Sequence, residues 1–367
     1  MDIHEKILSN LDQSLSTCAI FLDLAKAFDS VSHNILVRKM KKYGIRGNVF
    51  NLFQSYLHAR SQVVKINDIH SSLVNVEFGV PQGSILGPLL FLIFINDLPQ
   101  ASKFFIRLFA DDTFLCAQNE DLWLLEKEVN TELIKVHKWL ASNKLTLNMD
   151  KSKCMLISKK RKTSNIFIRI NGKELKHCDS YKYLGVYLDK NLSWKPHIEH
   201  VCKKISKACG ALAKTRHFVD EDTLTSIYYA LINSYLRYGA VAWGNASTEV
   251  LQPLHSLINR AMRIMSFSPF GRVATKPIYD YFNILTIEQT FMLESGKFIY
   301  KSKNALLPNS TIASHFSREL VNHGYNLRIR NTGASIIPVE LLSVYAQKSI
   351  QHKTAEIWDK IPASIRD

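Results

Sequence analysis

Ile106-Arg107-Leu108-Phe109-Ala110-Asp111-Asp112-Thr113-Phe114-Leu115-Cys116-Ala117 places two adjacent carboxylates between two apolar runs. The flanking residues favour strands, so the sequence predicts a β-hairpin with Asp111 and Asp112 at its tip. Two carboxylates this close repel each other, which raises the pKa of one of them unless a cation lies between them. A divalent metal ion would supply that cation, whereas the alternative is a solvated hairpin turn.

A third carboxylate ends another apolar run, Cys18-Ala19-Ile20-Phe21-Leu22-Asp23. This run predicts a buried strand with Asp23 at its end, and a helical pattern that includes Ala27 and Val31 follows directly. Three carboxylates are oxygen ligands that Mg²⁺ accepts, and water and substrate phosphate fill its remaining positions. Such sites hold two metal ions that assist an in-line displacement at phosphorus. The alternative is that Asp23 caps the following helix.

The segment between these acids carries a longer motif, Gly79-Val80-Pro81-Gln82-Gly83-Ser84-Ile85-Leu86-Gly87-Pro88. It lies between Phe21-Leu22-Asp23-Leu24-Ala25-Lys26-Ala27-Phe28-Asp29 and Phe109-Ala110-Asp111-Asp112. In this order the three motifs resemble the palm motifs of reverse transcriptases from non-LTR retrotransposons of the jockey type. Residues 145–152 resemble the lysine-bearing palm motif, and residues 183–188 resemble the primer-grip strand pair. The resemblance covers residues 18–190, with a weaker helical likeness up to the C-terminus.

The resemblance implies an RNA-directed DNA polymerase that adds deoxynucleotides to the 3′-hydroxyl of a primer. Its metal ligands would be Asp23, Asp111 and Asp112, with Asp23 and Asp111 as the principal ones. They would hold two Mg²⁺ ions, with Mn²⁺ as the alternative metal. The implied partners are an RNA template, a DNA primer and deoxynucleoside triphosphates.

The resemblance also implies substrate contacts beside the metal ligands. Phe28 matches the aromatic residue that occupies the space of a ribose 2′-hydroxyl, and its alternative is a core aromatic on an amphipathic helix. Gln82 and Gly83 match a loop that contacts the incoming nucleotide and the template; without the resemblance they would indicate a turn. Lys151 matches a catalytic lysine that balances charge at the departing pyrophosphate, and its alternative is a surface lysine.

The expected fold class is α+β: a polymerase palm, with an antiparallel sheet backed by helices, then a helical thumb and a helical C-terminal region. The expected domains are a palm with partial fingers at 1–190, a thumb at 191–275 and a region of unknown role at 276–367. The periodicity predicts helices over about 122–142, 198–214 and 223–238, and strands over 155–158 and 166–170.

The charge of the chain is concentrated in one stretch. The whole chain has a formal net charge of +15, and residues 151–217 hold 17 basic residues against four acidic ones, a net +13. Phosphate contacts from such a stretch would supply affinity for nucleic acid, whereas the alternative is a solvated charged face. Aromatic residues that could pack on sugars or bases are interleaved with the lysines: Tyr181, Tyr183, Tyr187 and Trp194.

Other patterns set the compartment and exclude some classes. The six cysteines include no Cys-x-x-Cys pair, so a reduced protein inside the cell, nuclear and cytoplasmic, is expected. His197, His200 and Cys202 are close in sequence but are expected to be surface groups. Residues 85–95 are too short for a membrane span, so no membrane partner is expected. Residues 159–162 fit a nuclear-import signal or a basic turn equally well.

Only 22 residues precede Asp23, whereas the resemblance implies a longer fingers subdomain upstream. We therefore expect either a truncated copy of a mobile element or an incomplete gene model, and a partner that supplies the fingers is one alternative. Because positioning provides much of the catalysis in phosphoryl transfer, the alternative function is a catalytically impaired remnant that binds nucleic acid. A two-metal nuclease would also fit the carboxylates, but it leaves Phe28 and the loop at Gln82 unexplained.

Overall fold

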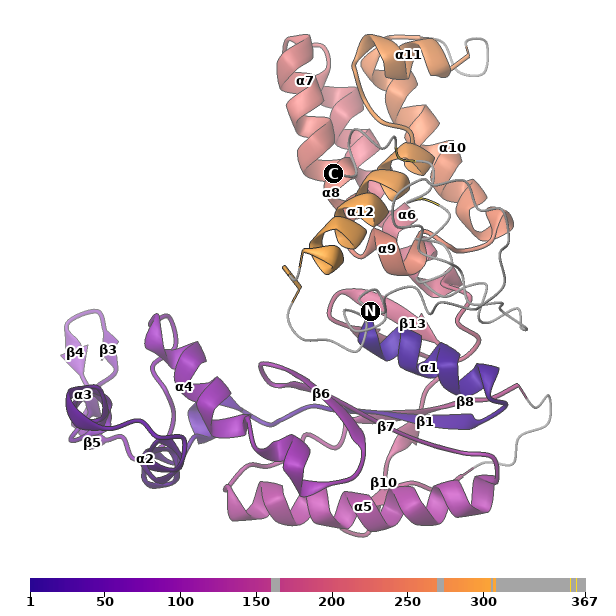
Figure 1. The fold of residues 1–367 in the computed structure, drawn as a ribbon. Coiled ribbons are helices and arrows are strands. Elements are labelled where there is room, and N and C mark those ends of the chain that lie inside the picture. The colour runs from indigo at the N-terminus through magenta and orange to yellow at the C-terminus, as the bar shows by residue number, and fades with distance from the viewer. Residues whose placement is uncertain (160–165, 269–273, 305, 308–356, 358–360, 362–367) are drawn as a thin grey trace. The chain divides into compact units, whose positions relative to one another are not determined.

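The computed structural model describes residues 1–159, 166–268, 274–304, 306–307, 357 and 361 (Figure 1). The chain divides into two compact units, Leu15–Asp179 and Met1–Ser14 together with Ser180–Asp367. Residues 160–162 of the basic run and most of the C-terminal region that was predicted to be helical lie outside the described residues.

The first unit is built on a five-stranded sheet in the order β11-β8-β1-β7-β6. Its strands are β1 (Ser16–Leu22), β6 (Phe105–Phe109), β7 (Asp112–Asn119), β8 (Lys153–Ile157) and β11 (Lys176–His177). All pairings are antiparallel except that of β8 with β11. Every residue of the central strand β1 is buried, as its apolar run predicts. The predicted hairpin is confirmed, because β6 and β7 pair up to Phe109 and Asp112.

Helix α5 (Leu122–Ser142) runs along one face of this sheet (Figure 1). Its bounds agree with the predicted helix. The Asp121 side chain begins the helix by accepting a hydrogen bond from the Leu124 amide at 2.9 Å. The residues at its buried positions recur with helical spacing and pack toward the sheet: Leu125, Val129, Leu133, Val136 and Leu140.

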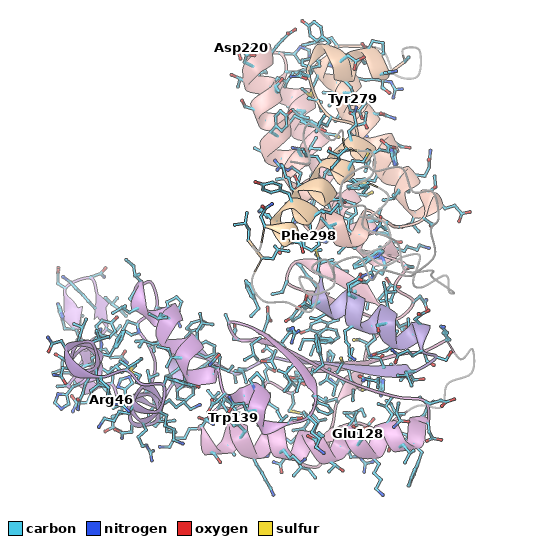
Figure 2. All side chains as sticks on the ribbon, viewed as in Figure 1. Arg46, Glu128, Trp139, Asp220, Tyr279 and Phe298 are labelled. Carbon is cyan, nitrogen blue, oxygen red and sulfur yellow. The ribbon has the colours of Figure 1, made fainter. Side chains whose placement is uncertain are left out.

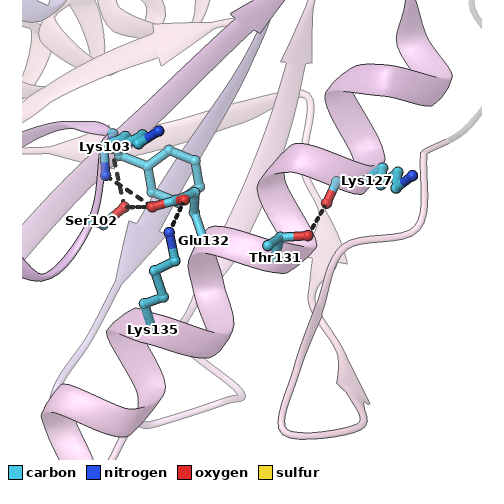
Figure 3. Close-up of polar contacts among 7 residues, drawn as sticks. Ser102, Lys103, Lys127, Thr131, Glu132 and Lys135 are labelled. Carbon is cyan, nitrogen blue, oxygen red and sulfur yellow. Dashed lines mark hydrogen bonds and ion pairs between the residues drawn. The ribbon is translucent and has the colours of Figure 1, made fainter.

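A buried carboxylate, Glu132, fixes α5 to the segment that precedes β6 (Figure 3). It accepts hydrogen bonds from the Ser102 hydroxyl and the Lys103 amide, both at 2.9 Å, and it pairs with the ammonium group of Lys135. Burial tends to raise the pKa of Glu132, but these partners stabilise the ionised form and bring the pKa below its ordinary value. The carboxylate therefore stabilises the fold above the ordinary pKa of a glutamate, and this contribution is lost as the pH falls through the lowered pKa.

Glu132→Ala is expected to lower the free energy of unfolding by about 2 kcal/mol at neutral pH, because it leaves the Lys103 amide without its acceptor. The variant should also lose part of the acid dependence of stability. Urea unfolding at neutral and acidic pH measures both effects. Glu128→Ala is the matched control, since Glu128 lies exposed on the same helix (Figure 2). Equal stability of the two variants would contradict the assignment.

Between β1 and β6 the first unit contains helices and two pairs of short strands. The helices are α2 (His33–Lys42), α3 (Gly47–Leu57) and α4 (Leu86–Ile95). The short strands β2 (Ser61–Gln62) and β5 (Val74–Asn75) pair with each other, as do β3 (Lys65–Ile66) and β4 (Ile69–His70). The buried Lys39 connects α2 to this assembly: its Nζ is 2.6 Å from both the Phe94 carbonyl oxygen and an Asp97 carboxylate oxygen. The same Nζ lies 4.5 Å from the ring centre of Trp139, which Figure 2 places on α5.

The prediction of a helix directly after Asp23 is wrong. Leu24 forms a β-bridge with Leu147, a 3₁₀ turn spans Phe28–Ser30, and α2 begins only at His33. The chain stays extended at Ser32 because that residue forms a β-bridge with Phe78, a partner distant in sequence. Asp23 therefore does not cap a helix. The predicted strand over 166–170 is also shorter in the structure, where only β9 (Arg169–Ile170) forms and pairs with β10 (Lys173–Glu174).

The second unit is mainly helical. It comprises α1 (Asp2–Asp12), the hairpin of β12 (Ser180–Tyr183) and β13 (Val186–Asp189), α6 (Lys195–Thr215), α7 (Glu221–Tyr228), α8 (Ser234–Arg237), α9 (Ala240–Trp243), α10 (Thr248–Met265), α11 (Lys276–Tyr281) and α12 (Ile287–Lys303). Helices α6 and α10 pack against each other. The predicted helix over 223–238 is interrupted by a π-helical turn at Tyr229–Asn233. Within the described residues, no helix is both long and apolar enough to span a membrane.

Two side chains of this unit lie deeper than the sequence indicated. Trp194 is only 5 % exposed and its ring centre is 5.0 Å from that of His4, so it cannot stack on a nucleic acid base. His197 is 2 % exposed, which corrects its prediction as a surface group. Its Nδ1 accepts a hydrogen bond from the Tyr187 amide, and burial lowers its pKa to about 4. The basic residues around His197 in the sequence suggested an exposed helix. In the structure, His197 lies in the first turn of α6 and faces inward.

Candidate active site

The two adjacent carboxylates lie where the β6–β7 hairpin turns. Asp111 is in the turn and Asp112 is the first residue of β7, opposite Phe109. Ala110 adopts the left-handed backbone conformation, with a φ of 50°, which makes the turn tight. Both acids are half-buried. The β6–β7 hairpin thus carries two adjacent carboxylates on a rigid main chain.

Asp23 joins them from the neighbouring strand. Leu22 pairs with Thr113 in the β1–β7 ladder, so Asp23 and Asp112 occupy the next positions at the same end of the two strands. Burial raises the pKa of Asp112, and the negative charges of Asp111 and Asp23 raise it further. The mutual repulsion that the sequence predicted for the Asp pair is therefore present and extends to the third acid.

The donor set of this cluster suits a hard divalent cation, because it consists of carboxylate oxygens at a partly open edge. The repulsion at Asp112 also fits a bound cation, since a positive charge between the acids would relieve it. The chemistry of the donors fits, but their present arrangement does not: among the residues that the structure describes, no group of three or more His, Cys, Asp or Glu side chains is arranged to hold a metal ion. The three carboxylates would therefore have to turn toward one another to share one.

The main chain of Asp23 is held on both sides by residues 148–152. The Asp23 amide donates to the buried Ser152 hydroxyl at 3.1 Å, and the Asp23 carbonyl oxygen accepts from the Asn148 amide at 2.8 Å. The same segment brings Lys151 to the site, where its Nζ lies 3.8 Å from Asp23 Oδ2. Lys153 instead donates to the Asp150 carbonyl oxygen at 2.6 Å. Of these two lysines, Lys151 is thus the one that contacts the acids.

Phe28 and the loop at Gln82 form a second group of predicted site residues. The half-buried Phe28 ring packs on Phe91 of α4, with the ring centres 4.6 Å apart. Its carbonyl oxygen accepts a hydrogen bond from the Val80 amide at 2.9 Å, which fixes the loop against it. Gln82 and Gly83 are exposed, and Gly83 has a φ of 80°, a conformation that suits glycine.

One residue of this group was not singled out from the sequence. Asp29 Oδ1 accepts a hydrogen bond from Gln82 Nε2 at 2.8 Å. Its place directly after Phe28 was the only hint in the sequence that Asp29 belongs to the site. No local pattern indicates that the loop at Gln82 folds back to Asp29. Long-range pairing of residues 28–33 with residues 77–80 creates the contact.

The family model of the reverse transcriptase (RNA-dependent DNA polymerase) matches residues 3–188, half of the chain. The chain therefore belongs to the reverse transcriptase family. The match includes all three acids, Phe28, the loop at Gln82 and Lys151, and it confirms the family that the motifs indicated.

Curated relatives refine this assignment. The chain is 26 % identical over 263 residues to the RNA-directed DNA polymerase from mobile element jockey of Drosophila melanogaster, covering 68 % of this chain and 28 % of that protein. It is 27 % identical over 309 residues to the probable RNA-directed DNA polymerase from transposon BS of the same species, covering 80 % of this chain and 33 % of that protein. The chain thus spans about a third of the length of these relatives.

Among solved structures, the telomerase of Candida albicans in complex with a fragment of telomeric RNA matches with a TM-score of 0.35 and 14 % identity. That match covers 83 % of this chain and 52 % of the telomerase chain. Apo telomerase from Candida tropicalis matches with a TM-score of 0.38 and 12 % identity, covering 86 % of this chain and 56 % of that chain.

Proposed function

We propose that this chain is an RNA-directed DNA polymerase that adds deoxynucleotides to a primer 3′-hydroxyl at the Asp23–Asp111–Asp112 cluster. The observation that carries the proposal is the gathering of these three acids at one end of β1 and β7, where burial and then the charges of Asp111 and Asp23 raise the pKa of Asp112. The membership of the chain in the reverse transcriptase family supports the same reaction.

The three carboxylates would hold two Mg²⁺ ions, with Mn²⁺ as the alternative, and Asp23 and Asp111 would be the principal ligands. Bound there, the ions would activate the attacking 3′-hydroxyl and neutralise charge on the departing pyrophosphate. Asp112 begins β7 and is therefore fixed by the strand ladder. The Ser152 and Asn148 contacts hold the Asp23 main chain, so the carboxylate projects from a fixed backbone position.

Phe28 and the Gln82 loop would form the part of the site that receives the nucleotide. We propose that the Phe28 ring fills the space of a ribose 2′-hydroxyl and selects deoxynucleotides. Its position five residues after Asp23 and its support by Phe91 favour this role. Gln82 and Gly83 would contact the nucleotide and template, because their loop is exposed and Gly83 lets a ligand approach the main chain.

The partners that we propose are an RNA template, a DNA primer and deoxynucleoside triphosphates. The basic residues of α6 support nucleic acid binding, because three lysines on its exposed side, Lys203, Lys204 and Lys207, present positive charge that can neutralise phosphates. We also propose that the chain is organised into a palm, a thumb and a C-terminal region. For its location in the cell we propose the nucleus and the cytoplasm, where RNA templates are available.

Lys151 is proposed to stabilise charge at the departing pyrophosphate. Lys151→Met is expected to lower kcat for single-nucleotide addition about 10²-fold, because one cationic contact to the developing charge is lost. Pre-steady-state primer extension measures the effect. Lys153→Met is the matched control and should retain the wild-type rate, since the Lys153 ammonium turns to the Asp150 carbonyl oxygen. Equal losses of kcat in both variants would contradict this role and would indicate that Lys151 contributes only to the general positive charge of the site.

A primer-extension assay distinguishes the proposed polymerisation from hydrolysis. It uses a DNA primer that is labelled at its 5′ end and annealed to an RNA template. A polymerase converts this primer to longer products when Mg²⁺ and deoxynucleotides are added, and to none when EDTA removes the metal. A two-metal nuclease would instead shorten the primer or template under the same conditions. Shortened products without extension would contradict the proposed function.

A further inference from the structure

Residues 28–33 and 77–80 are distant in sequence but form one hydrogen-bonded unit. The Gly79 amide donates to the Val31 carbonyl oxygen at 2.8 Å, and the His33 amide donates to the Glu77 carbonyl oxygen at 3.3 Å. Ser32 and Phe78 form a β-bridge between these bonds. The segment that carries Asp29 and the loop that carries Gln82 therefore hold a fixed distance from each other.

Close packing at Gly79 tightens this unit. Gly79 has a φ of 89°, and a Cβ atom there would lie 3.1 Å from the Asp29 main chain, so only glycine fits without a shift. The buried His33 ring donates from Nε2 to the Gly79 carbonyl oxygen at 2.7 Å. The main chain of Asp29 thus lies directly against the start of the loop.

The other side of the loop is fixed at the start of α4. The Ser84 hydroxyl donates to the Pro81 carbonyl oxygen at 2.8 Å and accepts from the Gly87 amide at 2.9 Å. A Cβ atom at Gly87 would lie 2.6 Å from the Pro81 carbonyl oxygen, so a larger residue would push the loop away. Gln82 therefore projects from a main chain that is held at both of its flanks.

The Asp29 carboxylate determines which end of the Gln82 amide faces outward. A carboxylate only accepts hydrogen bonds, so Gln82 must direct its NH₂ group toward Asp29, where Nε2 and Oδ1 are 2.8 Å apart. In the described part of the chain, no hydrogen bond to Gln82 Oε1 is present. The Gln82 carbonyl oxygen is consequently left as an acceptor at the exposed surface of the loop.

We propose that Asp29 is a positioning residue that fixes the orientation of the Gln82 amide, so that Oε1 accepts a hydrogen bond from the incoming nucleotide. The inference rests on the proposed function, because it assigns a use to the nucleotide contact of Gln82. Asp29 itself touches no substrate. Without it the exposed amide would turn freely, and binding would have to order a side chain that the wild-type protein holds ready.

The direct test is the kinetics of single-nucleotide addition on an RNA template. Asp29→Ala is expected to raise KM for the deoxynucleotide about fivefold and to leave kcat within about twofold, because the ordering of Gln82 affects binding. Asp29→Asn should give an intermediate KM, since its amide can pair with either end of Gln82. Ser30→Ala is the matched control: Ser30 lies in the same 3₁₀ turn, its hydroxyl donates to the main-chain oxygens of Ala25 and Lys26, and the variant should retain the wild-type KM.

A double-mutant cycle with Gln82→Ala separates positioning from a merely structural role. If Asp29 acts through Gln82, then Asp29→Ala has no further effect on KM in the Gln82→Ala background. Additive effects of the two substitutions would overturn the inference, as would an unchanged KM in Asp29→Ala.

A binding measurement distinguishes failure of the inference from failure of the proposed function. A primer that ends in a 2′,3′-dideoxynucleotide cannot be extended, so added deoxynucleotide can only stabilise the complex of protein, primer and template. Stabilisation that depends on Asp29 and Gln82 in a chain that extends no primer would contradict the polymerase but support the positioning role. Extension by the wild type without that dependence would overturn the positioning role alone, and neither extension nor stabilisation would overturn both.

Discussion

Asp111→Asn is expected to lower the rate of primer extension about 10³-fold, the largest effect of any single substitution in this chain. The change removes one charge from the group that we propose to hold Mg²⁺, while the amide keeps the shape of the side chain. Single-turnover extension with saturating Mg²⁺ and deoxynucleotide measures the loss. Asp150→Asn is the control, because its carboxylate is 93 % exposed and lies 3.8 Å from Lys176 Nζ, while the contacts of this segment with Asp23 come from the Asn148 amide and the Ser152 hydroxyl. A loss of similar size in Asp150→Asn would contradict the assignment.

When metal is absent, Asp111→Asn should unfold at a temperature equal to or above that of the wild type. Burial raises the pKa of Asp112 and the charge of Asp111 raises it further, so at neutral pH the repulsion between the two ionised carboxylates disfavours the folded state. Because the pKa of Asp112 is higher in the folded state than in the unfolded state, this destabilisation is absent at acidic pH. It grows as the pH rises through the pKa of the unfolded carboxyl toward that of the folded one. Lower activity with unchanged or greater stability is expected of an acid that is retained for function. A marked loss of stability would instead indicate a structural role.

Phe28→Val is expected to increase the incorporation of ribonucleotides relative to deoxynucleotides about 10²-fold. A smaller side chain opens the space that we assign to a ribose 2′-hydroxyl, and steric pockets of this kind discriminate by about this factor. The ratio of kcat/KM for the two nucleotides, measured on the same primer and template, isolates selectivity from any general loss of activity. Phe28 also packs on Phe91, so thermal unfolding should report a modest destabilisation.

Phe167→Val is the matched control for this experiment. Phe167 is 49 % exposed and its amide is held by Glu126 of α5, away from the acids along the chain. Its substitution should leave the ratio at the wild-type value. Unchanged discrimination in Phe28→Val would restrict Phe28 to the core role that its contact with Phe91 already provides.

The sequence predicted the acidic hairpin and its neighbouring strand well because both depend on local patterns. Apolar runs on each side of Asp111 and Asp112 favour strands, and the run before Asp23 is buried along its whole length in β1. The α5 helix could be predicted for the same reason, since its apolar residues recur with helical spacing and Asp121 caps it.

Features that depend on long-range pairing could not be predicted. The start of α2 was placed too early because Ser32 pairs with Phe78, and no local pattern reveals that bridge. The burial of His197 and Trp194 was missed because charged neighbours along α6 suggested an exposed surface. The bond from Gln82 to Asp29 depends on the same pairing that delays α2, so it became visible only in the folded chain.

The most direct test of the central claim compares the purified wild-type protein with the Asp111→Asn, Asp112→Asn double variant. Both are given a labelled DNA primer on an RNA template with deoxynucleotides and Mg²⁺, and binding of the same duplex is measured in parallel. We predict template-directed extension by the wild type, none by the double variant, and equal, salt-sensitive binding by both. Binding by the wild type without extension would contradict the account and would identify the chain as a remnant that only binds nucleic acid.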